Sequence, residues 1–270
     1  MAKSRIGLPR EVAPGIYWIG MCNEADAGGS MFHLHSSSFV ITGETHTLLF
    51  DTSPSPHWTT IERHLDAVLR TRSLDWIVSS HPEPAHAGNL PHLLRKYPGA
   101  RVLGEVRDYH LFFPEFEDRF VPGNAGLEID LGGDYKFRLL EGIIKDLPGT
   151  QWGYEASQQV LFVADAFAYT HHPPVSGLEE YPVHLAGECA LKSSELPLAP
   201  TVDQAAFITK AALFWTRYVR VDPFLQKLSA LLEQYPARLI APSHGAVIDT
   251  LEDILPIIYE AHVLAYQGAV

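Results

Sequence analysis

Residues that can bind a metal ion are crowded into the segment Ser79–Asn89, which reads SSHPEPAHAGN. His81, Glu83 and His86 lie within six positions of one another. Prolines and small residues surround them, so the segment has the pattern of neither a helix nor a strand. Imidazole and carboxylate groups at this spacing indicate a loop that binds a metal, although an isolated His-x-Glu pair is common in proteins that bind none.

Three further potential ligands follow apolar, strand-like runs elsewhere in the chain. Asp146 lies in IIKDLPG, Asp165 follows QVLFVA, and His244 follows LIAPS. Because strand ends carry loops to one rim of a sheet, these side chains are expected to meet the first group. A mixed nitrogen and oxygen set without thiolates suits iron, manganese or zinc. The ordinary alternatives are that Asp165 only ends a strand and that Asp146 caps a turn.

The elements that would position these residues alternate between β and α patterns. Short apolar or β-branched runs predict strands in the first third, and HWTTIERHLDAVLRT predicts an amphipathic helix over residues 57–71. LDWIVS predicts the strand that leads into the first ligand loop. The remaining predicted strands lie at residues 15–20, 38–42, 47–51, 100–104, 128–140, 159–163 and 239–240. The remaining predicted helices lie at 89–96, 202–234 (broken near Asp222-Pro223) and 251–266. This order predicts an α+β fold in one domain over residues 1–270, with a surface excursion at about 171–201.

Composition restricts the class of protein. The chain has 270 residues, of which 46% are apolar, and a formal net charge of −12. An acidic surface without a basic stripe predicts no nucleic-acid partner, and no apolar run is long enough for a membrane span. The first residues lack an apolar signal region, so we expect a cytoplasmic protein. Cys22 and Cys189 lie far apart without a CxxC pattern, which argues against a disulfide framework or a thiolate zinc site.

The order of motifs resembles the metallo-β-lactamase superfamily. LLFDT with Asp51, then SHPEPAH, VADAF and APSHG, match the superfamily's successive motifs from about Val12 onward. The resemblance implies a four-layer αβ/βα sandwich with a dinuclear metal site at one rim.

Within that superfamily the chain is most similar to the diiron domain of flavodiiron proteins. Hydrolases of the fold carry HxHxDH and flavodiiron proteins carry HxExDH, whereas this chain reads HPEPAH, with Glu83 at the glutamate position. VLFVADAFAY is similar to the family's segment around its bridging aspartate. The family's flavodoxin domain follows where this chain ends, so the resemblance implies no flavin here and a separate electron-donor protein.

The resemblance also implies a division of ligands between two metals. Metal two would be held by His86, His244 and the shared Asp165. Asp146 lines up with an isolated histidine of the family; the alternative alignment, shifted by one position, places Lys145 there. Ala85 replaces the family's aspartate and leaves a position open for a diatomic molecule or substrate; the alternative is a decayed site with one weak metal. The ligands implied for metal one are His81, Glu83, Asp146 and Asp165.

Three residues are candidates for roles beside the metals. His33 and His35 fall where the fold's early loop passes near the site and could orient a substrate or transfer protons. Tyr169 could line the pocket. Ordinary packing is the alternative for each. Asp51 is interpreted as structural, with a carboxylate able to accept a hydrogen bond from a liganding imidazole.

These inferences favour a non-haem diiron protein that binds or activates dioxygen or nitric oxide, as a reductase, a sensor or an oxygenase of a small-molecule substrate. Anionic oxygen ligands favour Fe(III), and two histidines with one carboxylate are typical of non-haem Fe(II) centres, with manganese or zinc as alternatives. The competing function is a zinc-dependent hydrolase of an ester, lactone or thioester. A third class, a non-catalytic binding module, would bind no metal at these residues. A homodimer is left open. In the family, a dimer brings the flavin of one subunit to the irons of the other, and that reason for pairing does not apply without a flavin domain.

Overall fold

The computed structural model describes residues 7–26, 31–170, 188–196 and 199–267. Seven strands form the first sheet in the order β1-β2-β3-β4-β5-β6-β7. The pairs from β1 to β4 are antiparallel, and β4, β5, β6 and β7 are parallel. The bounds are β1 Arg10–Ala13, β2 Ile16–Asp26, β3 Met31–Thr42, β4 Thr47–Phe50, β5 Trp76–Val78, β6 Arg101–Gly104 and β7 Phe120–Pro122.

Five strands form the second sheet in the order β12-β11-β10-β9-β8. Its pairs are antiparallel except β11 and β12, which run parallel. The bounds are β8 Glu128–Gly132, β9 Tyr135–Glu141, β10 Gln151–Glu155, β11 Val160–Phe162 and β12 Leu239–Ala241.

Alternating side chains of the first sheet enter two different cores. In β4, Leu48 and Phe50 pack with Phe137 and Phe162 of the second sheet, whereas Leu49 packs with Ile61 on the opposite face. Successive side chains of a strand point to opposite faces, so a strand covered on both sides is buried at every position. All four residues of β4 are buried for this reason.

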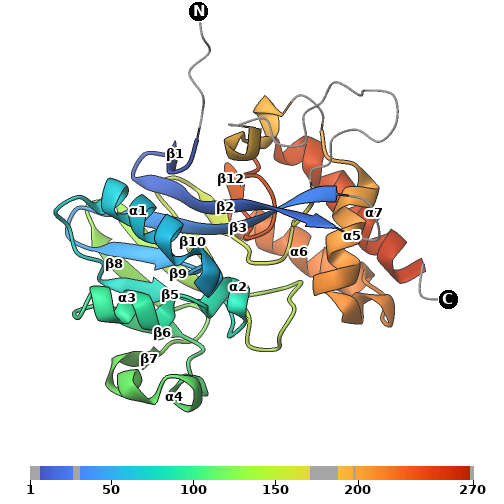
Figure 1. The fold of residues 1–270 in the computed structure, drawn as a ribbon. Helices are drawn as coiled ribbons and strands as arrows, with labels where there is room; N and C mark the ends of the chain where they lie inside the picture. Colours follow the sequence, from blue (N-terminus) through green and yellow to red (C-terminus); the bar gives the residue numbers. More distant parts are fainter. Residues whose placement is uncertain (1–6, 27–30, 171–187, 197–198, 268–270) are drawn as a thin grey trace, which may run out of the picture.

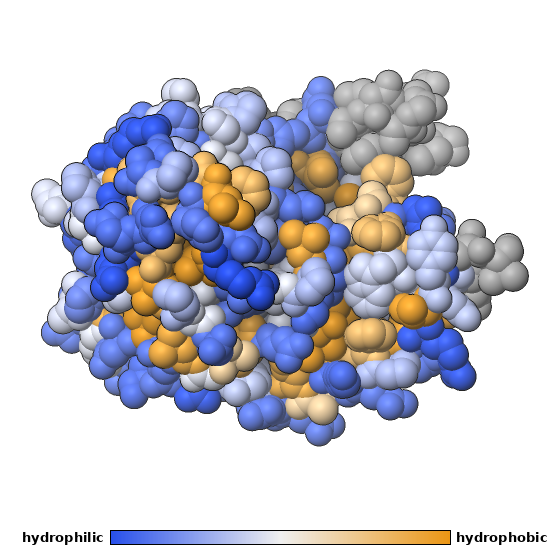
Figure 2. Space-filling view, turned by 90° about the horizontal axis from the view of Figure 1, so that it is seen from below, coloured by the Kyte–Doolittle hydropathy of each residue, from blue (hydrophilic) through white to orange (hydrophobic). Residues whose placement is uncertain are grey.

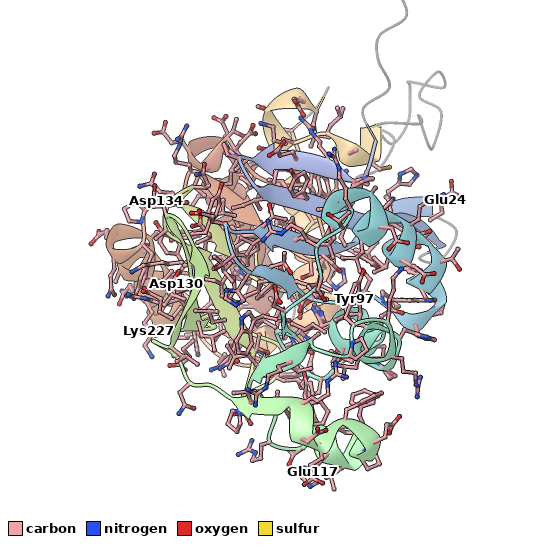
Figure 3. All side chains as sticks on the ribbon, turned by 90° about the vertical axis from the view of Figure 1, so that its left-hand side faces the viewer. Glu24, Tyr97, Glu117, Asp130, Asp134 and Lys227 are labelled. Atoms are coloured by element: carbon pink, nitrogen blue, oxygen red, sulfur yellow. The ribbon has the colours of Figure 1, made fainter. Side chains whose placement is uncertain are left out.

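Helices complete the outer layers of the sandwich. α1 and α3 cover the first sheet, with α2 beside them, and α5, α6 and α7 lie toward the other end of the molecule (Figure 1). Figure 3 shows the sandwich from the side, with Asp130 and Lys227 on one flank and Glu24 on the other. The bounds are α1 Trp58–Leu69, α2 Pro84–Ala87, α3 Leu90–Lys96, α4 Tyr109–Phe112, α5 Val202–Ala212, α6 Asp222–Gln234 and α7 Leu251–Gln267. The short 3₁₀ helices are η1 Ser55–His57, η2 Pro114–Arg119, η3 Glu188–Ala190, η4 Ser193–Glu195 and η5 Phe214–Arg217.

The predicted α+β sandwich is confirmed, and local details differ from the predictions. The helical region expected over 202–234 has its break at Asp222-Pro223, where α6 begins, but α5 already ends at Ala212 and a 3₁₀ turn occupies part of the gap. Part of the first ligand loop is the four-residue helix α2, with Pro84 in its first turn. The strand β10, which was not predicted, supplies the centre of the second sheet. Most of the excursion expected at 171–201 lies outside the described residues, so its course stays a prediction.

The surface is mixed rather than divided into apolar and polar faces. Figure 2 shows hydrophobic residues between hydrophilic ones over the face seen from below. Among the helices that the structure describes, none has the length and apolarity that a membrane crossing needs.

Candidate metal centre

The first ligand loop is held by hydrogen bonds from the neighbouring strand end. β4 and β5 are parallel, so the residues after both strands lie at the same edge of the sheet. The Ser80 amide donates to Asp51 Oδ1 at 2.8 Å, and the Thr52 amide donates to the His86 carbonyl at 2.9 Å. Asp51 itself has φ of 57°, a conformation that non-glycine residues adopt at a cost. The loop that carries His86 is therefore fixed at both ends.

Asp165 and His244 are positioned by the second sheet. They follow β11 and β12, which are also parallel neighbours, so the two side chains emerge at one edge. The Ser243 amide donates to the Ala164 carbonyl at 2.8 Å, and the Tyr169 amide donates to the His244 carbonyl at 2.9 Å. These backbone bonds join the two loops to each other.

Three imidazoles converge on the carboxylate of Asp165. His81 Nε2 lies 3.3 Å from Asp165 Oδ2. His86 Nε2 and His244 Nε2 each lie 3.2 Å from Asp165 Oδ1. One oxygen therefore faces one histidine and the other oxygen faces two, which is the division expected of a carboxylate that bridges two metals.

The second nitrogen of each imidazole is bound by the protein, which fixes the ring. His86 Nδ1 donates to Asp51 Oδ2 at 2.8 Å, and His244 Nδ1 donates to the His35 carbonyl at 2.6 Å. His81 Nδ1 lies 3.1 Å from the Ser80 hydroxyl. Since a carboxylate or carbonyl only accepts, His86 and His244 carry the proton on Nδ1 and present an unprotonated Nε2 in their neutral forms.

His81 also belongs to a second group of potential ligands. Ligand atoms of His81, Glu83 and Asp146 all lie within 4.8 Å of one another. Asp146 comes from the loop between β9 and β10 and is half-buried. Burial and the adjacent Glu83 carboxylate raise the pKa of Asp146 to about 7, because two carboxylates this close do not both ionise readily. A cation between them would remove that repulsion.

The buried charges of the centre shift one another's pKa values. Burial and the neighbouring His86 lower the pKa of His81 to about 3. Burial alone would lower the pKa of His86 and raise those of Asp51 and Asp165. Their mutual attraction and hydrogen bonds outweigh burial, so the pKa of His86 is raised well above its usual value and both carboxylates are held below theirs.

The residues fit a metal ion. His81 Nε2 is buried and has no hydrogen-bond partner among the residues that the structure describes, a costly state for a polar atom. Nitrogen and carboxylate oxygen are the donors that iron, manganese and zinc accept. The orphaned nitrogen, the shared carboxylate and the close pair of acids together describe a site built for cations.

The three residues predicted to act beside the metals, His33, His35 and Tyr169, have different surroundings. His35 contacts it through its carbonyl, whereas its Nε2 lies 2.8 Å from the Cys189 carbonyl. His33 lies in a separate group with Cys22 and Cys189. Tyr169 is fully buried, and its hydroxyl donates to the Ala246 carbonyl at 3.4 Å.

Two serines of the site were not predicted from the sequence. The Ser80 hydroxyl lies 3.1 Å from both His81 Nδ1 and His86 Nδ1, and the Ser243 hydroxyl donates to Asp51 Oδ2 at 2.6 Å. The signal was present in SSH and PSH, where a serine directly precedes a candidate ligand. Asp51 acts as interpreted, accepting from His86.

Known proteins resemble the chain along most of its length. A family model described as ODP family beta lactamase matches residues 34–245. The type A flavoprotein fprA of Rhodobacter capsulatus is 27% identical over 173 residues, covering 59% of this chain and 39% of that protein. The anaerobic nitric oxide reductase flavorubredoxin of Aeromonas hydrophila is 23% identical over 253 residues, covering 87% of this chain and 46% of that protein.

A solved structure shows the same fold. Rubredoxin oxygen:oxidoreductase from Desulfovibrio gigas superposes with a TM-score of 0.70 at 16% identity, covering 96% of this chain and 61% of that one. The chain spans less than half the length of the curated relatives it matches. The family model covers well over half of the chain, from within β3 to the residue after His244, and includes every candidate ligand described above. The protein therefore belongs to the ODP family of metallo-β-lactamase-fold proteins, whose fold it shares with the diiron cores of flavodiiron proteins.

Proposed function

We propose that this protein holds two iron ions at the rim of the sandwich and uses them to reduce or bind a diatomic gas, dioxygen or nitric oxide. The observation that carries the proposal is the arrangement around Asp165, whose two oxygens face different histidines at 3.2 to 3.3 Å. His86 and His244 would hold one ion. The other ion would be held by His81, Glu83 and Asp146, with Asp165 shared between the two.

Iron is favoured by the charge of the donor set. Glu83, Asp146 and Asp165 place three carboxylates beside three imidazoles, and anionic oxygen ligands stabilise the higher oxidation state of iron. When bound, a pair of ferrous ions supplies two electrons to a diatomic ligand. The protein keeps Asp165 ionised through its contacts with His86 and His244, so this shared ligand is ready at neutral pH.

Ala85 leaves the side of the centre near metal two without a protein donor. The residue is half-buried in α2, directly before His86, and its methyl group offers no ligand atom. A small apolar side chain there leaves room beside metal two for a diatomic molecule. The resemblance implies an aspartate at this position in hydrolases and flavodiiron proteins alike, so Glu83, rather than Ala85, is the residue that favours the diiron function.

The choice of substrate and donor is supported by the relatives. One relative is named as an anaerobic nitric oxide reductase and a structural neighbour as a rubredoxin oxygen:oxidoreductase. Reduction of two nitric oxide molecules to nitrous oxide and water takes two electrons and two protons, which two ferrous ions and solvent can supply. Repeated turnover would take electrons from a separate donor protein.

The test is metal analysis followed by a single turnover. Protein produced in iron-supplemented medium should contain about two iron ions per chain. After anaerobic reduction, mixing with dioxygen or nitric oxide should oxidise the iron and consume the gas in stoichiometric proportion. His110→Ala is the matched control, because His110 is an exposed histidine bound to the Arg107 carbonyl, outside the candidate centre.

Two outcomes would contradict the proposal. Zinc-containing protein that cleaves a lactone or thioester and does not react with either gas would assign the site to hydrolysis. Iron-containing protein that is not reoxidised by either gas would remove the redox function while leaving the metal site in place.

A further inference from the structure

A second cluster of potential metal ligands lies beside the candidate diiron centre. Ligand atoms of Cys22, His33 and Cys189 all lie within 4.8 Å of one another. Cys189 Sγ is 3.4 Å from His33 Nδ1. The residues come from β2, β3 and η3, so the cluster exists only in the folded chain.

The pairing of β2 and β3 explains how the cluster forms. Cys22 lies opposite His35, and Glu24 lies opposite His33. Partners across an antiparallel pair share a face, and positions two residues apart share it too, so Cys22, His33 and His35 project from one side of the ribbon. η3 covers that side, where His35 Nε2 contacts the Cys189 carbonyl at 2.8 Å.

The segment that carries Cys189 is fixed by its own contacts. Arg10 donates to the Ala190 carbonyl at 2.6 Å and pairs with Glu195. The Ser193 hydroxyl donates to Asp249 at 3.0 Å. The segment from Ala190 to Glu195, directly after Cys189, is therefore held by side chains of β1 and of the loop before α7.

We propose that Cys22, His33 and Cys189 form a thiolate-containing site for a zinc-like divalent cation, separate from the histidine and carboxylate centre. Two thiolates and one imidazole are a preferred donor set for zinc, with a fourth position for water or another ligand. Zinc bonds of about 2.3 Å to sulfur and about 2.0 Å to nitrogen in a tetrahedron place those atoms about 3.5 Å apart. The 3.4 Å between Cys189 Sγ and His33 Nδ1 matches that spacing.

His35 connects the two sites. The His35 ring contacts the Cys189 carbonyl, and the His35 carbonyl accepts from His244 Nδ1 at 2.6 Å. A cation bound by Cys189 would fix η3 against β3 and with it the hydrogen-bond partner of His244. The thiolate site thus acts as a structural clamp behind metal two, and it does not depend on which metal or gas the main centre uses.

The reduced, metal-depleted full-length chain is titrated with Co²⁺ to test the clamp. Sulfur-to-cobalt charge transfer gives a near-ultraviolet band that the main centre, which has only nitrogen and oxygen donors, cannot produce. The band should saturate at the intensity of one thiolate-bound cobalt per chain, whatever cobalt the main centre also takes up, disappear in Cys22→Ser and Cys189→Ser, and persist in His86→Ala. X-ray absorption of the zinc-loaded wild-type protein should show sulfur at about 2.3 Å, a readout that requires no variant.

The alternative for two close thiols is a disulfide. Alkylation and mass measurement of the protein purified without reductant distinguish the two, since a disulfide blocks both cysteines while bound zinc is released by a chelator and frees both. A disulfide, or cobalt binding without the sulfur band, would overturn the proposal. Loss of iron reactivity with the sulfur band intact would contradict the proposed function and leave the thiolate site standing.

Discussion

The carboxylate of Asp165 is the residue on which the candidate centre converges. It is buried, and its oxygens lie 3.2 to 3.3 Å from the Nε2 atoms of His81, His86 and His244. In the metal-free protein a buried carboxylate needs these partners, and in a loaded protein cations would take their place. The residue therefore contributes to folding and to metal binding through the same two oxygens.

Removing one imidazole should empty one half of the centre. His86→Ala should reduce iron from about two to about one per chain, because it removes a ligand of metal two and leaves His81, Glu83 and Asp146 intact. Metal analysis after gel filtration measures the change, with His110→Ala as control. His244→Ala should lower the iron content by the same amount, although the His244 side chain lies nearer the surface. Unchanged stoichiometry in both variants would show that the ligand division is wrong.

The pair formed by Glu83 and Asp146 should give the metal-free protein a pH-dependent stability. The pKa of Asp146 rises from 3.8 to about 7 in the folded state. A raised pKa contributes stability that is present below pH 3.8 and is lost as the pH rises to about 7. Asp146→Asn removes this dependence, so the variant should gain melting temperature relative to the wild type between pH 5 and pH 8, as followed by circular dichroism. A constant difference across that range would refute the shift.

Much of the candidate site could be inferred from single residues in the sequence, because the candidate ligands follow recognisable strands. His81, Asp165 and His244 each follow an apolar strand, and strand ends meet at sheet edges. The cluster of Cys22 and Cys189 ran against the prediction, because their separation in the sequence argued against a thiolate site and the fold nevertheless brings them together. Their proximity depends on the length of the β2–β3 ribbon and on the position at which η3 packs against it. Neither follows from spacing in the sequence.

At the scale of elements, short connections after parallel strands determine the geometry. The loops after β4, β11 and β12 contain residues with positive φ, namely Asp51, Ala164 and Gly245. Such conformations cost free energy unless the surrounding structure enforces them. They turn the chain sharply at the rim and bring the ligands out of the sheets.

Gly245 is a position where this turn would strain any side chain. Its φ is 146°, and an added Cβ would lie 3.2 Å from the Tyr169 ring. Gly245→Ala should destabilise the protein by about 1–3 kcal/mol and weaken iron binding at metal two, because His244 is the adjacent residue. Urea unfolding and chelator competition measure the two effects. Gly99→Ala, where a Cβ meets nothing within 4 Å, is the control. Equal effects of the two substitutions would show that the turn is not strained.

Element boundaries were predictable where periodicity was strong and failed where tertiary contacts override it. α1 lies within the predicted helix because its apolar positions repeat at helical spacing. In the helical region expected over 202–234, the break at Asp222-Pro223 coincides with the start of α6, whereas the end of α5 at Ala212 and the η5 turn were not expected. The interval between these helices has no breaking residue that would mark the turn in advance.

At the scale of the whole molecule, the centre joins two sheets. His81, Glu83 and His86 follow a strand of the first sheet, whereas Asp165 and His244 follow strands of the second. Bound cations would therefore connect the two halves of the sandwich. Binding that occurs only in the folded state adds to global stability.

Removal of metal should lower the melting temperature of the entire chain. At a free metal concentration of 100 times Kd the contribution is about 2.7 kcal/mol, which corresponds to about 5–10 °C for a chain of this size. Calorimetry before and after chelation measures the shift. On chelation, the melting temperature of His110→Ala should fall by as much as that of the wild type, and the melting temperature of His86→Ala should fall by less. A chelator-insensitive transition in iron-containing protein would contradict a centre that bridges the sheets.

The placement of β12 has a consequence for biosynthesis. β12 is an edge strand of the second sheet and pairs only with β11 among the described strands. His244 follows it and is the last of the candidate ligands to leave the ribosome. The half of the centre that His244 shares with His86 is therefore the last to receive its full set of donors as the chain is synthesised.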